Sequence, residues 1–154
     1  MNINDMLSSD AMLINFNGTS KKQVLDELSR IAEKKLEINS RSLLESLTKR
    51  EKLGSTAVGN GIAIPHVNVS NIEKPYVFVS TLAHGLDFNS PDDQPVDIIF
   101  LLVAPENNGS EHLQALAFIS RLLRNKDLTT KLRGCKNTES ALAVISQSIR
   151  EKAA

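Results

Sequence analysis

Cysteine is almost absent from this chain, because Cys135 is the one cysteine among its 154 residues. A single thiol forms no disulfide within the chain and supplies no cysteine-based zinc site. The three histidines (His66, His84 and His112) are spaced too irregularly for a recognised zinc pattern. We therefore expect no metal site and no role for Cys135, and we expect His84 to be a structural residue in a turn before Gly85.

An excess of charge and a long apolar run are also lacking. The chain has 18 basic and 18 acidic residues, which argues against binding to nucleic acid or to an anionic membrane surface. The longest apolar run, Ile98 to Ala104, is far shorter than the ~18 residues that a membrane span requires. The N-terminal MNINDMLSSDAML does not have the charge and hydropathy pattern of a signal peptide. A cytoplasmic protein is the expectation.

The common nucleotide and hydrolase motifs are missing as well. There is no Walker A sequence and no G-x-S-x-G elbow. Gly59 and Gly61 form a G-x-G, but the third glycine and the following helix of a dinucleotide fingerprint are absent. We therefore expect no nucleotide and no other cofactor.

What the sequence does contain is the pattern of one α/β domain. Its hydrophobic fraction of 41% is enough for a sizeable core without disulfides or metal. Apolar residues at helical spacing predict helices at about 20–36, 40–49, 110–124, 128–132 and 138–149. Short β-branched and apolar runs predict strands at 12–16, 62–64, 76–82 and 96–103. We predict a mixed central β-sheet flanked by α-helices, although the strand order is not readable from the pattern.

Two helix starts carry recognisable capping residues. Ser20 and Gln23 form an S-x-x-Q capping box ahead of the first helix. Asn137 is the expected N-cap of the last helix, and Glu139 lies favourably in its first turn.

The stretch GNGIAIPHVNV, from Gly59 to Val69, holds the first candidate site residue. Pro65 biases Ile64 towards an extended conformation, so His66 is expected where a strand ends and a loop begins. The two glycines can adopt backbone conformations closed to other residues and permit close approach of another group. These features describe a histidine presented to a ligand, but taken alone they also fit an ordinary loop histidine.

Two further residues are candidates. His112 lies in the first turn of the predicted 110–124 helix, on the same face as apolar Leu116 and Ile119. A helix N-terminus favours anions, although a boundary histidine satisfied by its neighbours would look the same. Arg50, at the end of a helix upstream of the glycines, offers a fork of donors suited to phosphate, yet most such arginines are simply solvated.

Taken together, the segment REKLGSTAVGNGIAIPH resembles the active-site segment of type-2 enzyme IIA domains of the bacterial phosphoenolpyruvate-dependent phosphotransferase system. The likeness continues through LDFNSPDDQPVDIIFLLVAPE and SEHLQALAFISRLLRN. It covers residues 5–149 and implies one enzyme IIA domain with a mixed sheet flanked by helices.

The resemblance also implies roles for the candidate residues. It makes His66 the phosphoryl acceptor, with His112 assisting it and Arg50 contacting the phosphoryl group. Backbone N–H groups of Gly59, Asn60 and Gly61 are expected as further donors. Such a protein forms a phosphohistidine intermediate with no metal or nucleotide, and it is a phosphotransferase component rather than a stand-alone metabolic enzyme.

Within that family the chain looks most like the stand-alone nitrogen-regulatory enzyme IIA, since it ends at Ala154 without an enzyme IIB or transporter domain. The resemblance implies a histidine phosphocarrier as phosphoryl donor and regulated partners, for example potassium-transport systems or metabolic enzymes. One alternative is an enzyme IIA that passes phosphate to an enzyme IIB for fructose- or mannitol-type transport. A departure from the family pattern, Val67-Asn68 in place of glycine and a basic residue, keeps open a binding module that does not accept phosphate.

Overall fold

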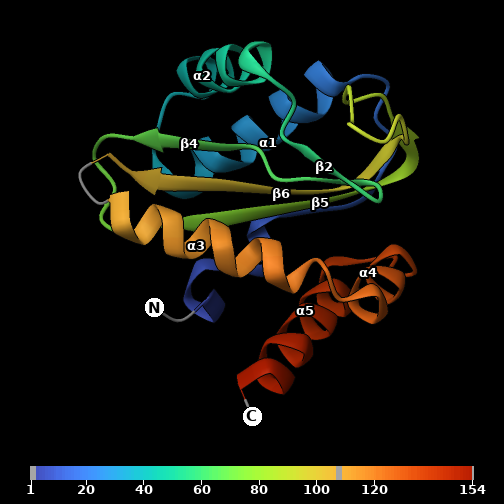
Figure 1. Cartoon of the computed structure of the whole chain (residues 1–154). Helices are drawn as coiled ribbons and strands as arrows, with labels where there is room; N and C mark the ends of the chain where they lie inside the picture. The colour runs from blue at the N-terminus through green and yellow to red at the C-terminus, as the bar shows by residue number, and fades with distance from the viewer. Residues whose placement is uncertain (1–2, 107–108, 154) are drawn as a thin grey trace.

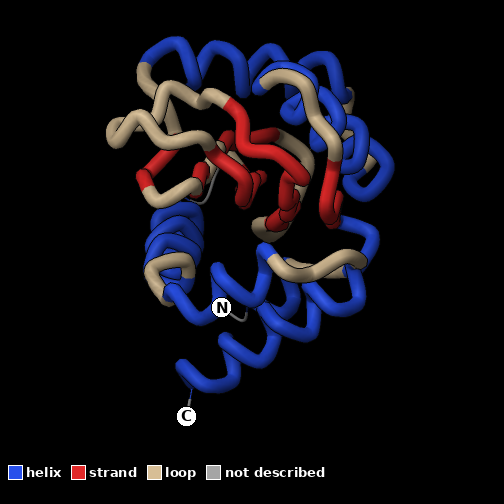
Figure 2. The backbone as a smooth tube through the Cα atoms, turned by 90° about the vertical axis from the view of Figure 1, so that its right-hand side faces the viewer, coloured by secondary structure: helices blue, strands red, loops and turns tan. Residues whose placement is uncertain are grey.

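A six-stranded mixed sheet forms the centre of the computed structural model, which describes residues 3–106 and 109–153. Figure 1 shows helices α1 and α2 on one side of the sheet and α3, α4 and α5 on the other. Figure 2, turned by 90°, shows the same three layers with the strands enclosed between the helices. This arrangement confirms the predicted α/β class with a mixed sheet flanked by helices.

The strands are β1 (Met12–Phe16), β2 (Ala57–Gly59), β3 (Ile62–Ala63), β4 (His66–Val69), β5 (Tyr76–Leu86) and β6 (Val96–Pro105). They follow the order β1-β5-β6-β3-β2, and β4 also pairs with β6. β5 is antiparallel to β6, whereas β3 and β4 both run parallel to it. Because β3 and β4 lie one after the other along β6, the chain from Ile62 to Val69 is nearly a single strand.

Five α-helices and two 3-10 turns complete the described chain: η1 (Ile3–Met6), η2 (Ser9–Ala11), α1 (Lys21–Leu36), α2 (Ser40–Leu53), α3 (Gly109–Leu122), α4 (Lys126–Arg133) and α5 (Thr138–Ala153). The predicted caps are confirmed at both sites: Ser20 Oγ accepts from the Gln23 N–H at 3.1 Å, and Asn137 Oδ1 accepts from the Ser140 N–H at 2.8 Å. These bonds satisfy N–H groups that have no partner within their helices.

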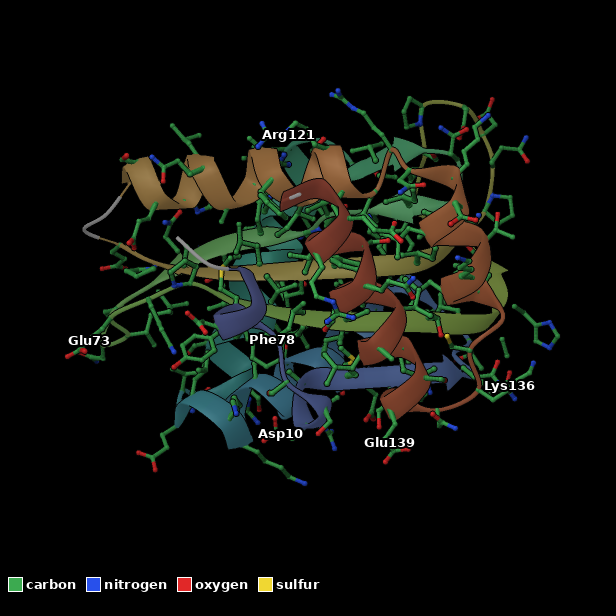
Figure 3. The ribbon with its side chains drawn as sticks, turned by 90° about the horizontal axis from the view of Figure 1, so that it is seen from below. Asp10, Glu73, Phe78, Arg121, Lys136 and Glu139 are labelled. Atoms are coloured by element: carbon green, nitrogen blue, oxygen red, sulfur yellow. The ribbon has the colours of Figure 1, made fainter. Side chains whose placement is uncertain are left out.

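The middle strand β6 is apolar because both of its faces are buried. Alternate residues pack under α3, α4 and α5: Ile98, Phe100 and Leu102. The intervening residues pack under α1 and α2: Ile99, Leu101 and Val103. Figure 3 views the molecule from the side of α3 and α5, where these helices cover the strands. A residue paired with β6 faces the same helical layer as the β6 residue opposite to it.

Two expectations about the strands were wrong. His84 lies in β5 rather than in a turn, on an exposed stretch where the pairing with β6 shifts register between Thr81 and Leu86. His66 begins a strand, β4, instead of following the last strand residue. The pairing with β6 continues past Pro65, since Ile62 is opposite Ile98 and His66 is opposite Leu102.

None of the helices in residues 3–106 and 109–153 combines the length and the apolar character needed to cross a membrane.

Candidate functional site

His66 faces the helical layer of α3. The register against β6 is unchanged across Pro65, so His66 lies on the same face as Ile62 and Ile64. Both isoleucines belong to the core beneath α3, α4 and α5. The half-buried imidazole is therefore held at the edge of this core rather than on a free loop.

A hydrogen bond defines which nitrogen of His66 is available. Nδ1 lies 2.8 Å from the carbonyl oxygen of Ile64. A carbonyl oxygen only accepts hydrogen bonds, so Nδ1 must carry the proton and donate it. In the neutral ring, Nε2 then has the lone pair. The backbone thus selects the tautomer whose Nε2 can act as a nucleophile.

His112 meets His66 from α3. The two ring centroids are 5.5 Å apart, with the planes inclined at 66° in an edge-to-face arrangement. His112 Nδ1 is buried without a hydrogen-bond partner among the described residues. An unpaired buried polar atom is costly and needs an explanation in a native structure. Two residues separated by 46 positions in the sequence therefore form one histidine pair with unused hydrogen-bonding capacity.

The pKa of His112 lies below its ordinary value of 6.5, first because burial disfavours the charged form and second because a charge on His66 repels it. His112 is accordingly neutral near pH 7. This leaves one ring nitrogen as a donor and the other as an acceptor.

The lowered pKa of His112 predicts a loss of stability in mild acid. As the pH falls below about 6.5, the unfolded chain binds a proton at this position before the folded chain does, so the free energy of unfolding decreases until the pH has passed below the lowered folded-state pKa. Urea denaturation at about pH 7.5 and about pH 5.5 measures the change. His112→Gln removes this component, so its free energy of unfolding should fall less between the two values. Equal pH dependence in both proteins would contradict the assignment.

Arg50 lies in the last turn of α2, in the layer on the other side of the sheet. Its Nη1 donates to the carbonyl oxygen of Gly54 at 2.8 Å. No hydrogen bond joins it to either histidine within the part of the chain that the structure describes. The Gly54 loop nevertheless runs beside the site, because the Ile64 N–H donates to the Thr56 carbonyl oxygen at 3.0 Å. Arg50 is thus bonded to a loop whose Thr56 is joined to Ile64, two residues before His66.

The glycine turn is not brought to His66. Ile62 and His66 are opposite positions four residues apart on β6, which corresponds to about 13 Å along a strand. The turn also has other partners: the Asn60 N–H donates to Asp92 Oδ2 at 2.9 Å, and its carbonyl oxygen accepts from Arg133 at 2.7 Å. The geometry therefore does not support the expected contribution of Gly59, Asn60 and Gly61 to the site of His66.

The positive φ angles of Gly59 and Gly61 explain why glycine is used in this turn. A Cβ atom on Gly61 would lie 2.7 Å from Arg133 Nη2 and 2.9 Å from Asp97 Oδ1. The turn lines a cavity of about 530 Å³ together with residues of α3 and α4. Arg133 and Asp97 form an ion pair at 3.0 Å, and Gly61 permits the tight hairpin to lie against it.

Val67 and Asn68, the two residues that depart from the family pattern, have separate surroundings. Val67 is 7% exposed and packs in the core beneath α1 and α2. Asn68 lies on the same strand face as His66, and its Nδ2 donates to the Pro105 carbonyl oxygen at 3.1 Å. The valine is therefore a packing residue, whereas the asparagine joins β4 to the last residue of β6.

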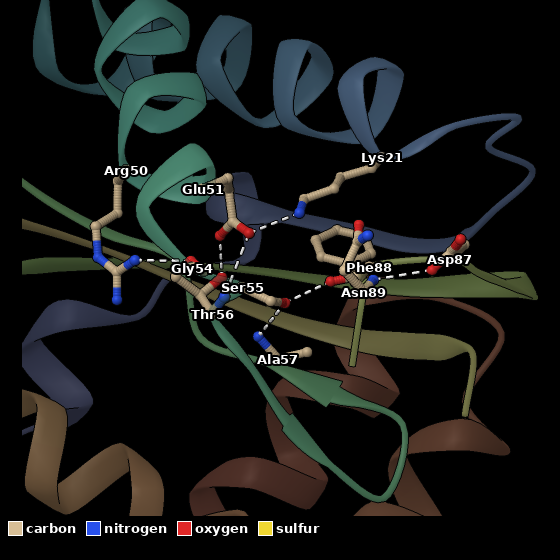
Figure 4. A network of polar contacts seen from close by, with 10 residues as sticks. All are labelled: Lys21, Arg50, Glu51, Gly54, Ser55, Thr56, Ala57, Asp87, Phe88 and Asn89. Carbon is tan, nitrogen blue, oxygen red and sulfur yellow. Dashed lines mark hydrogen bonds and ion pairs between the residues drawn. The ribbon is translucent and has the colours of Figure 1, made fainter. Parts of the chain in front are cut away.

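Sequence reasoning missed Glu51. Its side chain is 6% exposed and pairs with Lys21 Nζ at 2.7 Å (Figure 4). It also accepts hydrogen bonds from the N–H and the hydroxyl group of Thr56. A signal was present, because Glu51 continues the buried stripe of Leu43 and Leu47 at intervals of four residues. A carboxylate in such a stripe is buried and needs partners.

Within residues 3–106 and 109–153, no three side chains of the types His, Cys, Asp or Glu are grouped as metal ligands. The arrangement offers an imidazole whose Nδ1 is bonded to a carbonyl oxygen, so that in the neutral ring Nε2 has the lone pair, beside a second imidazole.

Comparison with known proteins identifies the family of this chain. The family model for the phosphoenolpyruvate-dependent sugar phosphotransferase system, EIIA 2, matches residues 5–148. A nitrogen regulatory protein of Bradyrhizobium diazoefficiens is 44% identical over 146 residues, covering 95% of each chain. One from Pseudomonas aeruginosa is 36% identical over 144 residues, covering 93% of this chain and 94% of the other.

The fold agrees as well. The crystal structure of nitrogen regulatory protein IIA-Ntr from Neisseria meningitidis superposes with a TM-score of 0.86 at 29% identity, covering 93% of this chain and 98% of the other. The match of the family model to nearly the whole chain, together with these relatives, shows that the chain belongs to the EIIA type-2 family of the phosphoenolpyruvate-dependent phosphotransferase system.

Proposed function

We propose that this chain is a phosphoryl-carrier and regulatory protein of the nitrogen-related phosphotransferase system. It accepts a phosphoryl group on Nε2 of His66 from a histidine phosphocarrier protein, and its phosphorylation state regulates partner proteins. Membership of the EIIA type-2 family and the similarity to nitrogen regulatory proteins support this function. The observation that carries it is the fixed tautomer of His66, which leaves Nε2 free beside the ring of His112.

In the proposed reaction, the Nε2 lone pair of His66 forms a bond to phosphorus while the bond between phosphorus and the donor's histidine nitrogen breaks. The electron pair of the broken bond stays on the donor nitrogen. The His66 ring keeps its Nδ1 proton and therefore gains positive charge as the new bond forms. The Ile64 carbonyl oxygen, 2.8 Å away, stabilises that charge more strongly than it stabilises the neutral ring.

The transferring group carries negative charge on its three equatorial oxygens, so positioned donors lower the barrier. In this proposal His112 donates a ring N–H to one of these oxygens, from the helix that faces His66. In the same proposal Arg50, in the last turn of α2, directs its remaining guanidinium donors to the phosphoryl group. The chain supplies these groups itself, and the step requires no metal or nucleotide.

Two leucines that are neighbours in sequence of the candidate residues or of the Gly54 loop are exposed. Leu113, the residue after His112, is 66% exposed, and Leu53, next to the Gly54 loop, is 86% exposed. Large exposed side chains of this kind gain free energy when a partner covers them. In this proposal the two leucines are contact points for a protein donor.

Incubation with phosphoenolpyruvate, enzyme I and a histidine phosphocarrier tests the proposal. We expect intact-mass analysis to show one added phosphoryl group that is labile in acid. A sugar-transport enzyme IIA is the alternative function, and adding candidate enzyme IIB proteins distinguishes the two. Rapid discharge to an enzyme IIB would favour transport, whereas retention would favour regulation. No uptake from a competent carrier would contradict both and leave a binding module.

A further inference from the structure

Glu51 is a buried carboxylate that the proposed transfer step does not use directly. It lies in the last turn of α2 and holds Lys21, the first residue of α1, through a 2.7 Å ion pair. The Lys21 ammonium also lies 5.0 Å from the ring centre of Phe88. A buried ion pair commonly contributes little net stability, because desolvation of both charges offsets their attraction. Its presence therefore calls for a reason beyond stability.

The ion pair fixes the loop between α2 and β2. One oxygen of Glu51 accepts from the Thr56 N–H at 3.2 Å, and the other accepts from the Thr56 hydroxyl group. Ser55 is held as well, since its hydroxyl group donates to the Phe88 carbonyl oxygen. Figure 4 shows these contacts converging on the loop from α1, α2 and the segment around Phe88. Thr56 is consequently held through its backbone and its side chain at once.

Thr56 in turn holds the residue that orients His66. Its carbonyl oxygen accepts from the Ile64 N–H at 3.0 Å. On the other side of the same segment, the Pro65 carbonyl oxygen accepts from the Leu102 N–H of β6 at 2.9 Å. The Ile64–Pro65 step is therefore clamped between the loop and β6. Because of this clamp, the Ile64 carbonyl oxygen points to Nδ1 of His66.

We propose that Glu51 and Thr56 are positioning residues that hold His66 in the Nδ1–H tautomer, through the chain of contacts from Glu51 to Thr56, Ile64 and the His66 ring. This inference rests on the proposed function for its purpose, since a free imidazole exchanges between two tautomers and only one leaves Nε2 available. The same contacts keep the Ile64 carbonyl oxygen in place while the ring gains positive charge. Lys21 holds the Glu51 carboxylate in position through the 2.7 Å ion pair.

Thr56→Val is the main test, because it removes the hydroxyl group but keeps the β-branched shape and the backbone N–H. Thr56→Ser keeps the hydroxyl group and is the rescue variant. Glu51→Gln removes the charge at nearly constant shape. Its matched control is Asp26→Asn, which removes one negative charge from the exposed ion pair with Arg30.

Nitrogen NMR of the unphosphorylated protein gives the primary readout. In the wild type we expect His66 Nδ1 to show the chemical shift of a protonated nitrogen and Nε2 that of a nitrogen with a free lone pair. In Thr56→Val and Glu51→Gln both shifts should move towards the average of two tautomers. Thr56→Ser and Asp26→Asn should keep the wild-type shifts.

The rate of phosphoryl uptake at saturating donor is the second readout. A small misplacement of reacting groups commonly costs one to two orders of magnitude in rate, so we expect a decrease of about tenfold or more in Thr56→Val and Glu51→Gln. Folding of each variant is checked by its thermal transition, and Thr56→Val decides the question if Glu51→Gln fails to fold.

The two readouts separate the inference from the proposed function. Wild-type ring shifts in a folded Thr56→Val protein would overturn the positioning role, whatever the rate. Altered ring shifts in a chain whose wild type takes up no phosphoryl group would support the tautomer lock and contradict the proposed function. Altered shifts with an unchanged rate would overturn the link from tautomer to transfer.

Discussion

His66→Ala will take up no phosphoryl group under conditions in which the wild type is fully modified. The variant removes the nitrogen lone pair that forms the bond to phosphorus, and no other group in the described site has a nitrogen fixed in this way. Intact-mass analysis after incubation with phosphoenolpyruvate, enzyme I and the phosphocarrier measures the loss. Because His66 is half-buried at the edge of the core, we expect the variant to remain folded, with a cooperative thermal transition.

His84→Ala is the matched control, since His84 is exposed on β5 and has no role in the proposed transfer. It should be phosphorylated as completely as the wild type. Modification of His66→Ala at the neighbouring His112 would reverse the two roles that we assign. If the wild type and both variants all remain unmodified, the result would instead favour the binding module that the Val67-Asn68 sequence left open.

Long periodic segments of this chain were predictable, and short paired ones were not. The apolar run of β6 and the capping residues Ser20 and Asn137 act within a few neighbouring residues, so their structural consequences can be read locally. β2 has three residues and β4 has four, which is too few for a periodic signal. The position of β4 depends on pairing with β6, which lies far along the sequence, and this information is not local.

The site shows the same division. Resemblance to the family singled out His66, His112 and Arg50, and the structure brings the two histidines to 5.5 Å. Proximity in sequence misled the expectation for the glycine turn, because an extended chain separates residues by about 3.3 Å per position. A few positions along a strand are therefore enough to place a residue out of reach of the site.

Glu51 illustrates a further reason why a site is incompletely predictable. Its helical stripe indicated burial, but not the identity of its partners. Those partners come from α1 and from the loop after α2, and they meet only in the folded chain. Sequence patterns state which face of an element is buried, whereas hydrogen-bond partners are decided by the packing of several elements together.

His112→Ala will be phosphorylated on His66 about a hundredfold more slowly than the wild type at saturating donor, because loss of one positioned donor to a developing charge commonly costs that much or more. His112→Gln retains an N–H donor of similar reach and should recover part of the rate. Rapid-quench measurement of phosphoryl uptake gives these rates, and an unchanged rate in His112→Ala would contradict the role of this residue.

The same role of His112 has a signature in its ionisation. In the unmodified protein, burial and the charge of His66 lower the pKa of His112. A phosphoryl group on His66 brings opposite charge to this buried ring, and opposite charge favours the protonated form. NMR titration should therefore show a higher pKa for His112 in the phosphorylated protein than in the unmodified one. His112 would then be neutral when the donor binds and positively charged when it holds the phosphoryl group. A bound partner would meet a different charge in the first turn of α3 in the two phosphorylation states.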